Sequence, residues 1–312
     1  MKQRMSWVCG LLALLLAVLL AGCGATETVG AETPGTSTVQ ETGPAEANRE
    51  GEPPEAEPAE PEAEETAEGV TIPPIALPEQ EPGVSYDMIG VIVYHGGIYT
   101  QAAYYDGHRA EALSGLVGEQ LGTALGTLDE WSTQDEYAVE CASNMNGPFY
   151  AVAGYDPGFR ICMTGNYEEE DGSETPYLWT FERLNGITLT DGASLFDRLH
   201  LRDRAVSAEV LSHADWNEGN QSARQPLEVP EETWDAFLAA LYESSVQAID
   251  YESAPDFYQN PRQGHLYVAL EDGTEVELRL LDGGWVCYLP LGWYAVQMPD
   301  TAFDALLKAC GA

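Results

Sequence analysis

The sequence predicts an α+β fold, in which antiparallel meander sheets are covered by a few helices. Between Gly83 and Ala312, short runs of strand-forming residues alternate with clusters of Gly, Pro, Asn and Asp. Segments with apolar residues at helical spacing lie beside these runs. The same order of elements occurs twice, so we expect a first half at 83–204 and a second half at 205–312.

The first half begins with a predicted turn and a predicted helix. "YHGGIYTQAAYY" (94–105) is typical of extended chain with a Gly-Gly turn. Apolar residues then recur at helical spacing, at Leu113, Leu116, Val117, Leu121 and Leu125. This spacing predicts a helix, although four glycines weaken it.

A meander is expected next. "YAVECA", "PFYAVAG" and "FRICMTG" are strand-forming segments separated by the turn segments "SNMNG" and "YDPG". "TPYLWTFERL" and "GITLT" continue the series as strands, and "ASLFDRLHL" predicts a short helix.

The second half starts with a helix after Pro230, whose apolar positions are Trp234, Phe237, Leu238 and Leu241. "LYVAL", "VELRL" and "WVCYL" form a second meander, with Asp272-Gly273 as the turn of its first hairpin. "WYAVQM" is a last strand. Pro299-Asp300 opens a final helix that buries Phe303, Leu306, Leu307 and Cys310.

The two series suggest an internal duplication. "GITLTDGASLFDRL" and "WYAVQMPDTAFDAL" both end in Phe-Asp-x-Leu, and each is a strand followed by a helix. The hypothesis of two related halves places the boundary near Arg204. Chance identity of a few residues is the alternative.

The N-terminus has the features of an export signal. Lys2 and Arg4 precede the apolar run Leu11 to Leu20, which is too short to span a bilayer as a stable helix. The quartet Leu20-Ala21-Gly22-Cys23 resembles a bacterial lipobox. The resemblance implies a signal peptide at 1–22, cleavage before Cys23 and a diacylglycerol on the Cys23 thiol. An ordinary secretory signal with an incidental cysteine is the alternative.

Residues 23–82 are expected to be a disordered tether rich in Glu, Pro and Ala. From Gly24 to Pro82 there are fifteen Glu, no Asp, one basic residue and no aromatic residue. This composition buries too little apolar surface to offset the entropy of the chain. In the polyproline conformation, at about 3.1 Å per residue, the segment reaches roughly 150 Å. Cation or partner binding by the glutamates is the alternative.

The charge of the folded part restricts its partners. Ten basic and thirty-seven acidic residues give it a formal charge of −27. Nucleic acid is excluded as a partner because each phosphate contact would add repulsion, and anionic headgroups are disfavoured for the same reason. The membrane contact is therefore expected through the acyl chains on Cys23.

Four cysteines lie in the folded part: Cys141, Cys162, Cys287 and Cys310. Two disulfides or unpaired buried thiols both fit an exported chain. As first and third strands of a meander, the segments of Cys141 and Cys162 would be too far apart to be bridged. Cys287 and Cys310 are the candidate disulfide, because the final helix should cover the strand of Cys287.

No motif for catalysis, metal or cofactor is found. The sequence has no Gly-x-Ser-x-Gly, no Ser-x-x-Lys, no Cys-x-x-Cys and no phosphate-binding glycine loop. His108 and Glu111 have one metal-ligand spacing, but a solvated helix start explains them as well. The acidic loop at 166–174 lacks the alternating ligands of a calcium site and is expected to be a hairpin loop. We therefore expect no metal and no cofactor.

The heptad "GYDPGFR" (154–160) is the most distinctive motif. As a recognition surface, it would present Tyr155, Asp156 and Arg160. As a structural motif, Asp156-Pro157-Gly158 would turn the chain and Arg160 would pair with a nearby acid, which we favour. Most of the tyrosines and tryptophans lie within predicted strands, where we expect them to be core residues.

These features predict where the protein is located and that it binds a partner, but they do not predict a chemical reaction. Beyond the lipobox, the acidic tether and the Asp-Gly hairpin are similar to those of uncharacterised surface lipoproteins of Gram-positive bacteria. We expect a lipid-anchored extracytoplasmic protein on the outer face of the cytoplasmic membrane. Its folded part would bind or scaffold an envelope protein, peptide or glycan. An envelope hydrolase using acidic residues and a sensory or regulatory domain are the alternatives. Two facing carboxylates in a cleft would favour the hydrolase, and an aromatic patch would favour binding.

Overall fold

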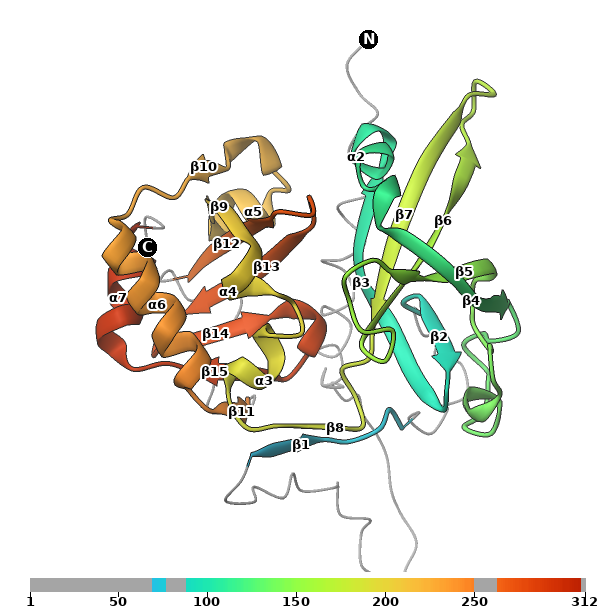
Figure 1. Cartoon of the computed structure of the whole chain (residues 1–312), viewed down its shortest axis with the longest axis horizontal. Coiled ribbons are helices and arrows are strands. Elements are labelled where there is room, and N and C mark those ends of the chain that lie inside the picture. Colours follow the sequence, from blue (N-terminus) through green and yellow to red (C-terminus); the bar gives the residue numbers. More distant parts are fainter. Residues whose placement is uncertain (1–68, 77–87, 250–262, 310–312) are drawn as a thin grey trace, which may run out of the picture. The chain divides into compact units, whose positions relative to one another are not determined.

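The structure, a computed structural model, describes residues 69–76, 88–249 and 263–309. It confirms the α+β class, because antiparallel sheets are accompanied by short helices (Figure 1). The predicted signal peptide, Cys23 and most of the predicted tether lie outside the described residues, and so does Cys310.

The first large sheet has six strands in the order β2-β3-β7-β6-β5-β4. Its strands are β2 (Val91–Tyr94), β3 (Gly97–Asp106), β4 (Val117–Leu125), β5 (Asn146–Val152), β6 (Arg160–Glu168) and β7 (Glu174–Glu182). Helix α2 (Gly107–Ala112) and the 3₁₀ helix η2 (Ser114–Leu116) connect β3 to β4. The predicted turn between β2 and β3 is confirmed, with Gly97 opposite Tyr94.

The segment at 141–143 links the two edge strands of this sheet. The Val93 amide donates to the Ala142 carbonyl at 2.9 Å, and the Leu125 amide donates to the Cys141 carbonyl at 3.0 Å. Because β2 and β4 share this connector, neither edge is left as an open row of backbone groups there. One buried cluster (Ile92, Tyr99, Ala124, Phe149, Ile161, Met163 and Phe181) packs on the inner face of the curved sheet.

Two predictions for this half are wrong. The segment with helical spacing forms strand β4 at Val117–Leu125, because pairing with β5 satisfies its backbone and its glycines disfavour a helix. Gly122 also lies against the ring of Phe149, where a Cβ would come within 2.5 Å of ring carbon. "YAVECA" is not a strand: it starts as the 3₁₀ helix η3 (Glu136–Ala138), and Cys141 has a positive φ of 63°.

The second large sheet has seven strands in the order β10-β9-β12-β13-β14-β15-β11. Its strands are β9 (Ala205–Ser212), β10 (Gln225–Pro226), β11 (Val246–Ala248), β12 (Gln263–Leu270), β13 (Glu275–Leu281), β14 (Trp285–Tyr288) and β15 (Tyr294–Gln297). The predicted meander β12-β13-β14-β15 is confirmed, with the Asp272-Gly273 turn in its first hairpin. The strand β9 was not predicted.

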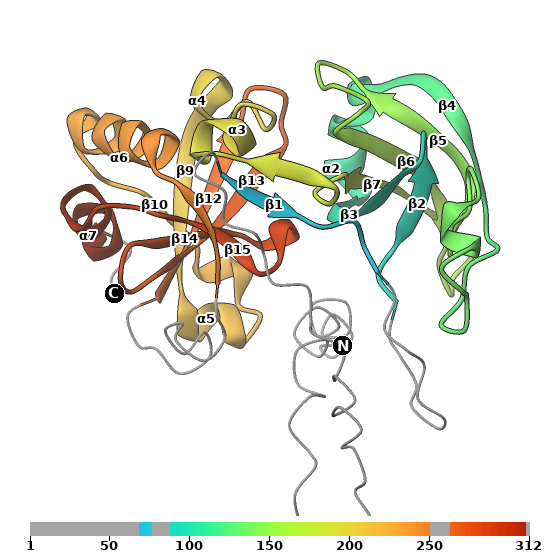
Figure 2. The same ribbon diagram turned by 90° about the horizontal axis from the view of Figure 1, so that it is seen from below.

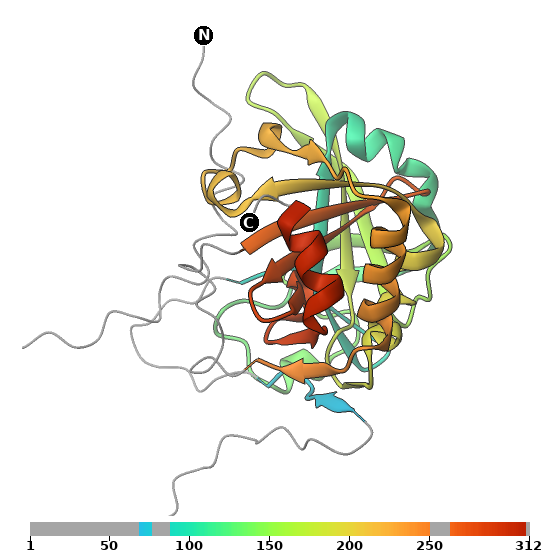
Figure 3. The same ribbon diagram turned by 90° about the vertical axis from the view of Figure 1, so that its left-hand side faces the viewer.

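Helices cover one face of this sheet (Figures 1 and 3). They are α3 (Gly192–Phe196), α4 (Leu201–Arg204), α6 (Glu231–Glu243) and α7 (Asp300–Ala309). The predicted apolar faces of β12 and β13 (Leu266, Val268 and Leu270; Val276, Leu278 and Leu280) are buried beneath them. Phe237, Leu241, Phe303 and Leu306 fill the same core from α6 and α7. The short elements α5 (His213–Asn217), η4 (Gln221–Ala223) and η5 (Leu289–Leu291) complete this half.

A small third sheet pairs a strand that precedes the predicted first half with a strand near the end of that half. Strand β1 (Val70–Ile72) pairs with β8 (Ile187–Leu189), and Figure 2 shows the two strands side by side. Val70 and Ile72 are buried in the core of the second half. The end of the predicted tether is therefore corrected: this Val-Thr-Ile stretch is strand-forming and apolar, and it folds with the domain.

The two halves do not repeat one arrangement. The first series starts with the strand β4 where the second starts with the helix α6, so the order of elements differs. Moreover, Phe196 and Phe303, from the two matching Phe-Asp-x-Leu ends, are buried in one shared core. Residues from Leu184 to Leu201 thus pack with the second sheet, although they precede the predicted boundary near Arg204. Within the described ranges, no helix has the length and apolar character needed to cross a membrane.

Candidate binding site

The "GYDPGFR" heptad forms a tight loop between β5 and β6. The Asp156 carboxylate accepts the Gly158 amide at 2.8 Å, and the Asp156 carbonyl accepts the amides of Phe159 and Arg160, both at 2.9 Å. An aspartate that bonds its own backbone two residues ahead is a preferred turn former. The turn places the ring of Phe159 in the core of the second half, where it is buried.

Helix α3 and the residues that follow it lie opposite the heptad loop, and the two segments enclose a pocket. Asp191 caps this helix by accepting the Ser194 amide at 2.8 Å, and the Ser194 side chain bonds back to the cap, as in a capping box. Arg198 donates from Nε to the Ser194 carbonyl at 3.1 Å, which directs its side chain along the helix. His200 follows in the left-handed region, with φ 56°, and starts α4.

His200 connects the segment after α3 to the heptad loop. Its Nε2 donates to the Gly154 carbonyl at 3.0 Å, and Arg204 donates to the same carbonyl at 3.1 Å. Gly154 has φ +83°, and a Cβ there would lie 3.1 Å from the Arg204 guanidinium. Glycine is therefore required at this position both by the backbone and by the close approach of Arg204.

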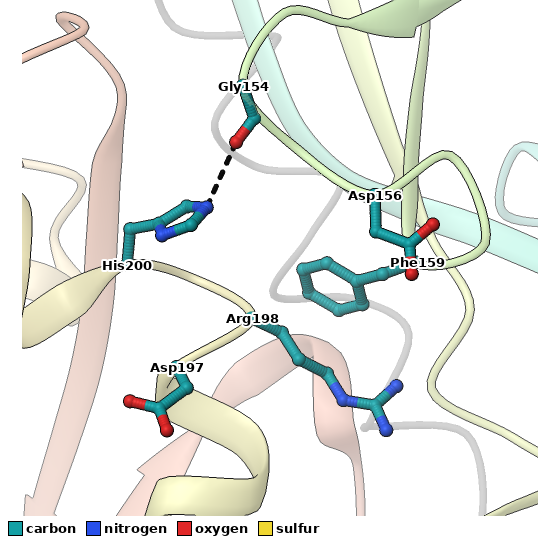
Figure 4. A pocket seen from close by; sticks show the side chains of 6 residues that line it. All are labelled: Gly154, Asp156, Phe159, Asp197, Arg198 and His200. Carbon is teal, nitrogen blue, oxygen red and sulfur yellow. Dashed lines mark hydrogen bonds between the residues drawn. The ribbon is translucent and has the colours of Figure 1, made fainter.

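A pocket of about 500 Å³ lies between the heptad loop and the segment that follows α3. It is lined by Gly154, Asp156, Phe159, Asp197, Arg198 and His200 (Figure 4). Its size is within the range of small-ligand sites. Asp156, Asp197 and Arg198 are exposed, so groups of both charges are available to a ligand.

A buried ion pair between Arg160 and Glu182 lies next to the heptad loop. Arg160 donates from Nε to Glu182 at 2.9 Å, and the Tyr288 hydroxyl lies 2.9 Å from the other Glu182 oxygen. Burial would lower the pKa of Arg160, but the Glu182 charge outweighs it and raises that pKa. Burial and the same carboxylate raise the pKa of Tyr288. The pairing of Arg160 with a nearby acid is confirmed.

Tyr155 makes a second connection between the halves. Its hydroxyl donates to Asp272 at 2.8 Å, and the Arg160 guanidinium lies 4.3 Å from the centre of its ring. Burial would raise the pKa of Asp272, but hydrogen bonds from Thr274 and Tyr155 outweigh it and hold that pKa below its usual value. Of the three candidate recognition residues, Asp156 lines the pocket, while Tyr155 and Arg160 are buried beside it.

The two carboxylates of the pocket do not face each other. Figure 4 shows the carboxylates of Asp156 and Asp197 on opposite sides, pointing away from each other. Its six lining residues include no Ser, Thr, Cys or Lys. A general acid and base acting on one bond must both reach it, and these two carboxylates diverge.

The other candidates from the sequence are surface features. His108 Nδ1 lies 3.2 Å from Glu111 Oε2, and both side chains are exposed on α2. The acidic loop connects β6 to β7 as a hairpin, in which Asp171 accepts the Ser173 amide at 2.9 Å. Among the described residues, no group of three or more His, Cys, Asp or Glu is placed to hold a metal.

A histidine pair was not predicted from the sequence, because its members are 52 positions apart. His213 Nδ1 lies 3.2 Å from His265 Nε2, with ring planes only 7° apart. On its other side, His265 Nδ1 is 3.5 Å from Glu277, and Trp216 stacks on its ring at 4.6 Å. Burial lowers the pKa of His265, and the partly exposed Glu277 only partly opposes this. No spacing rule could identify a pair formed between α5 and β12.

The cysteines divide between the faces of the first sheet. Cys141 packs with the inner cluster and Cys162 with a cluster on the opposite face. Both are free thiols, so the prediction that they do not pair is confirmed, for a different reason than strand order. Cys287 is buried, which raises the pKa of its thiol to about 12. Cys287 is also a free thiol, and it packs with Leu281 and Ala295 on the face of the second sheet opposite to the core that α7 enters. The predicted Cys287–Cys310 bond is therefore wrong at Cys287, and Cys310 itself lies outside the described residues.

No family model, no curated protein and no solved structure matches the chain. A function for the folded part therefore has to be inferred from its own residues. The pocket and its lining side chains are the basis for that inference.

Proposed function

We propose that the chain is a lipid-anchored extracytoplasmic protein whose folded part binds an envelope ligand without chemically changing it. The observation that supports this role is the pocket between the heptad loop and α3. It offers a guanidinium, an imidazole and two diverging carboxylates around the ring of Phe159 (Figure 4). Such a set suits recognition of a polar ligand, whereas hydrolysis requires convergent groups.

The charges of the pocket suggest the kind of ligand. Arg198 suits a carboxylate, because a guanidinium can hold it through two parallel hydrogen bonds. Asp156 suits an ammonium or hydroxyl group on the same ligand. A short peptide with a free carboxyl end, alone or attached to a glycan, carries both kinds of group. The lipobox at Cys23 and the acidic tether support a location where such envelope fragments occur.

Calorimetric titration tests this role. The mature chain, made soluble by Cys23→Ser, is titrated with a peptidoglycan stem peptide and with the same peptide attached to its disaccharide. We expect binding that Arg198→Ala and Asp156→Asn each weaken. Arg109→Ala is the matched control, since it removes an equally charged, half-exposed side chain from α2.

Two results would contradict the proposal. Equal binding by the Arg198→Ala and Arg109→Ala variants would mean that the pocket is not the site. Cleaved peptide or glycan, detected by mass spectrometry after incubation, would favour the hydrolase alternative instead.

A further inference from the structure

The inner face of the first sheet continues beyond its buried core as a row of aromatic side chains. Trp179 is opposite Met163 on β6 and Tyr104 on β3, so all three point to the face that buries Phe181. Two positions further along, Tyr177 is opposite Gly165, and Tyr167 follows on β6. We name Tyr104, Tyr167, Tyr177 and Trp179 the aromatic face.

The four rings form a continuous surface. The ring centres of Tyr104 and Trp179 are 5.3 Å apart, and those of Trp179 and Tyr177 and of Tyr177 and Tyr167 are each 6.4 Å apart. Tyr167 is 37% exposed and the other three are partly exposed. Tyrosines and tryptophans within strands were expected to be core residues, but these four lie where the core opens to solvent.

Gly165 makes room for this arrangement. A Cβ at position 165 would lie 2.8 Å from the Tyr177 hydroxyl oxygen. Any other residue would therefore displace the Tyr177 ring from its place across β6. Gly165 does not have a positive φ, so close approach of the ring, and not backbone conformation, accounts for the glycine.

Two acidic side chains lie beside the aromatic face. Asp106 is opposite Tyr177 on the same face, and Glu169 accepts the Thr175 hydroxyl at 2.9 Å. Burial, a hydrogen bond with Tyr167 and the charges of Asp106 and Glu169 raise the pKa of Tyr104. No Lys or Arg occurs on β3 or in the hairpin from Ile161 to Glu182.

We propose that the aromatic face docks a cationic peptide segment of a partner protein. Lysine and arginine side chains are attracted to the faces of Trp and Tyr rings, and the guanidinium group also stacks flat on them. Asp106 and Glu169 would pair with the same cations. An anionic partner is repelled here, and a neutral glycan would gain nothing from the surrounding charge.

This surface is separate from the pocket. The heptad loop ends at Arg160, the first residue of β6, whereas Tyr167 is near the end of that strand. Docking at the aromatic face therefore does not depend on the proposed ligand of the pocket, and the two proposals can fail independently. Arg198→Ala should leave peptide docking at the aromatic face unchanged.

Fluorescence anisotropy of a labelled oligolysine peptide tests the proposal on the mature chain carrying Cys23→Ser. The double variant Tyr104→Ala, Tyr167→Ala should bind about tenfold more weakly, which corresponds to losing about 1.4 kcal/mol of cation–π attraction. The double variant to Phe keeps both rings and should bind nearly as the parent does. Trp131→Ala, which removes another half-exposed aromatic residue, is the matched control and should have no effect.

Charge variants separate docking from general attraction to an acidic protein. Asp106→Asn with Glu169→Gln should weaken binding more than Glu228→Gln with Glu231→Gln, although each pair removes two charges. Added salt screens general attraction between exposed charges, so it should weaken peptide binding by the two double variants to the same degree.

Three results would overturn the proposal. One is no binding of oligolysine even at low salt, and another is equal binding by the parent and by the folded Ala double variant. The third is preferential binding of chitohexaose that the same Ala substitutions abolish, which would make the aromatic face a carbohydrate platform.

Discussion

The hydroxyl of Tyr288 lies 3.0 Å and 2.9 Å from the two carboxylate oxygens of Glu182, although the residues are 106 positions apart. Glu182 ends β7 in the first sheet and Tyr288 ends β14 in the second. The carboxylate is fully buried, and Arg160 completes its set of partners. This contact therefore joins the two sheets through one fully desolvated charge.

Glu182→Gln should strongly destabilise the domain. Removing one member of a buried ion pair leaves the other charge unpaired, which costs about 3–5 kcal/mol. Urea denaturation measures the loss. The triple variant Arg160→Met, Glu182→Leu, Tyr288→Phe removes every member of the cluster and should recover much of it. If the triple variant is no more stable than Glu182→Gln, the cluster stabilises the folded domain by more than the compensation of its own buried charges.

Gly154→Ala should lower stability and weaken ligand binding in the pocket. An alanine in the left-handed region costs about 1–2 kcal/mol, and here its Cβ would also press on Arg204. Gly96→Ala is the control, because Gly96 has φ +68° and a Cβ added there would meet no atom within 4 Å. Thermal unfolding should show the larger loss for Gly154→Ala, and equal losses would contradict the role given to Arg204.

Stability should fall as the pH falls from about 7 to about 5. Burial lowers the pKa of His265 in the folded chain, whereas an unfolded histidine takes up a proton near pH 6.5. The unfolded state therefore binds more protons in this window, so that stability rises with pH. Urea denaturation at several pH values should give a smaller slope for His265→Gln. An unchanged slope in the His265→Gln variant would contradict this origin of the pH dependence.

Cys23→Ser should abolish lipidation. The variant should be released to the medium or remain unprocessed, since the acyl chains are expected to supply the membrane affinity. Membrane fractionation with radiolabelled palmitate measures both properties. A Cys23→Ser chain that is still processed and firmly membrane-bound would refute the lipobox interpretation.

Non-reducing peptide mapping should find Cys287 as a free thiol. Its side chain packs with Leu281 and Ala295, on the face of the second sheet opposite to the core that contains Phe303 of α7. A Cys287–Cys310 bond, which would close a loop of some two dozen residues and be worth about 3 kcal/mol, would contradict this packing. A Cys141–Cys162 bond would contradict the packing of these residues on opposite faces of the first sheet.

Local patterns predicted the second half better than the first. The alternation in β12 and β13, the Asp-Gly turn and the apolar face of α6 each depend on neighbours a few residues away, so the sequence determined them. The spacing at 113–125 also resembled a helix, but β4 forms there because β5 offers a complete partner strand. Propensity is a weak guide when tertiary pairing is available.

By itself, the sequence determined the α+β class, the acidic charge and the turn in the heptad. Only the tertiary structure decided what the heptad does. The partners of Tyr155, Arg160 and Phe159 lie in distant segments, so no local pattern could name them. The pocket, the histidine pair and the aromatic face share this property. Each is formed where strands or helices far apart in the chain meet, and chain packing alone sets those distances.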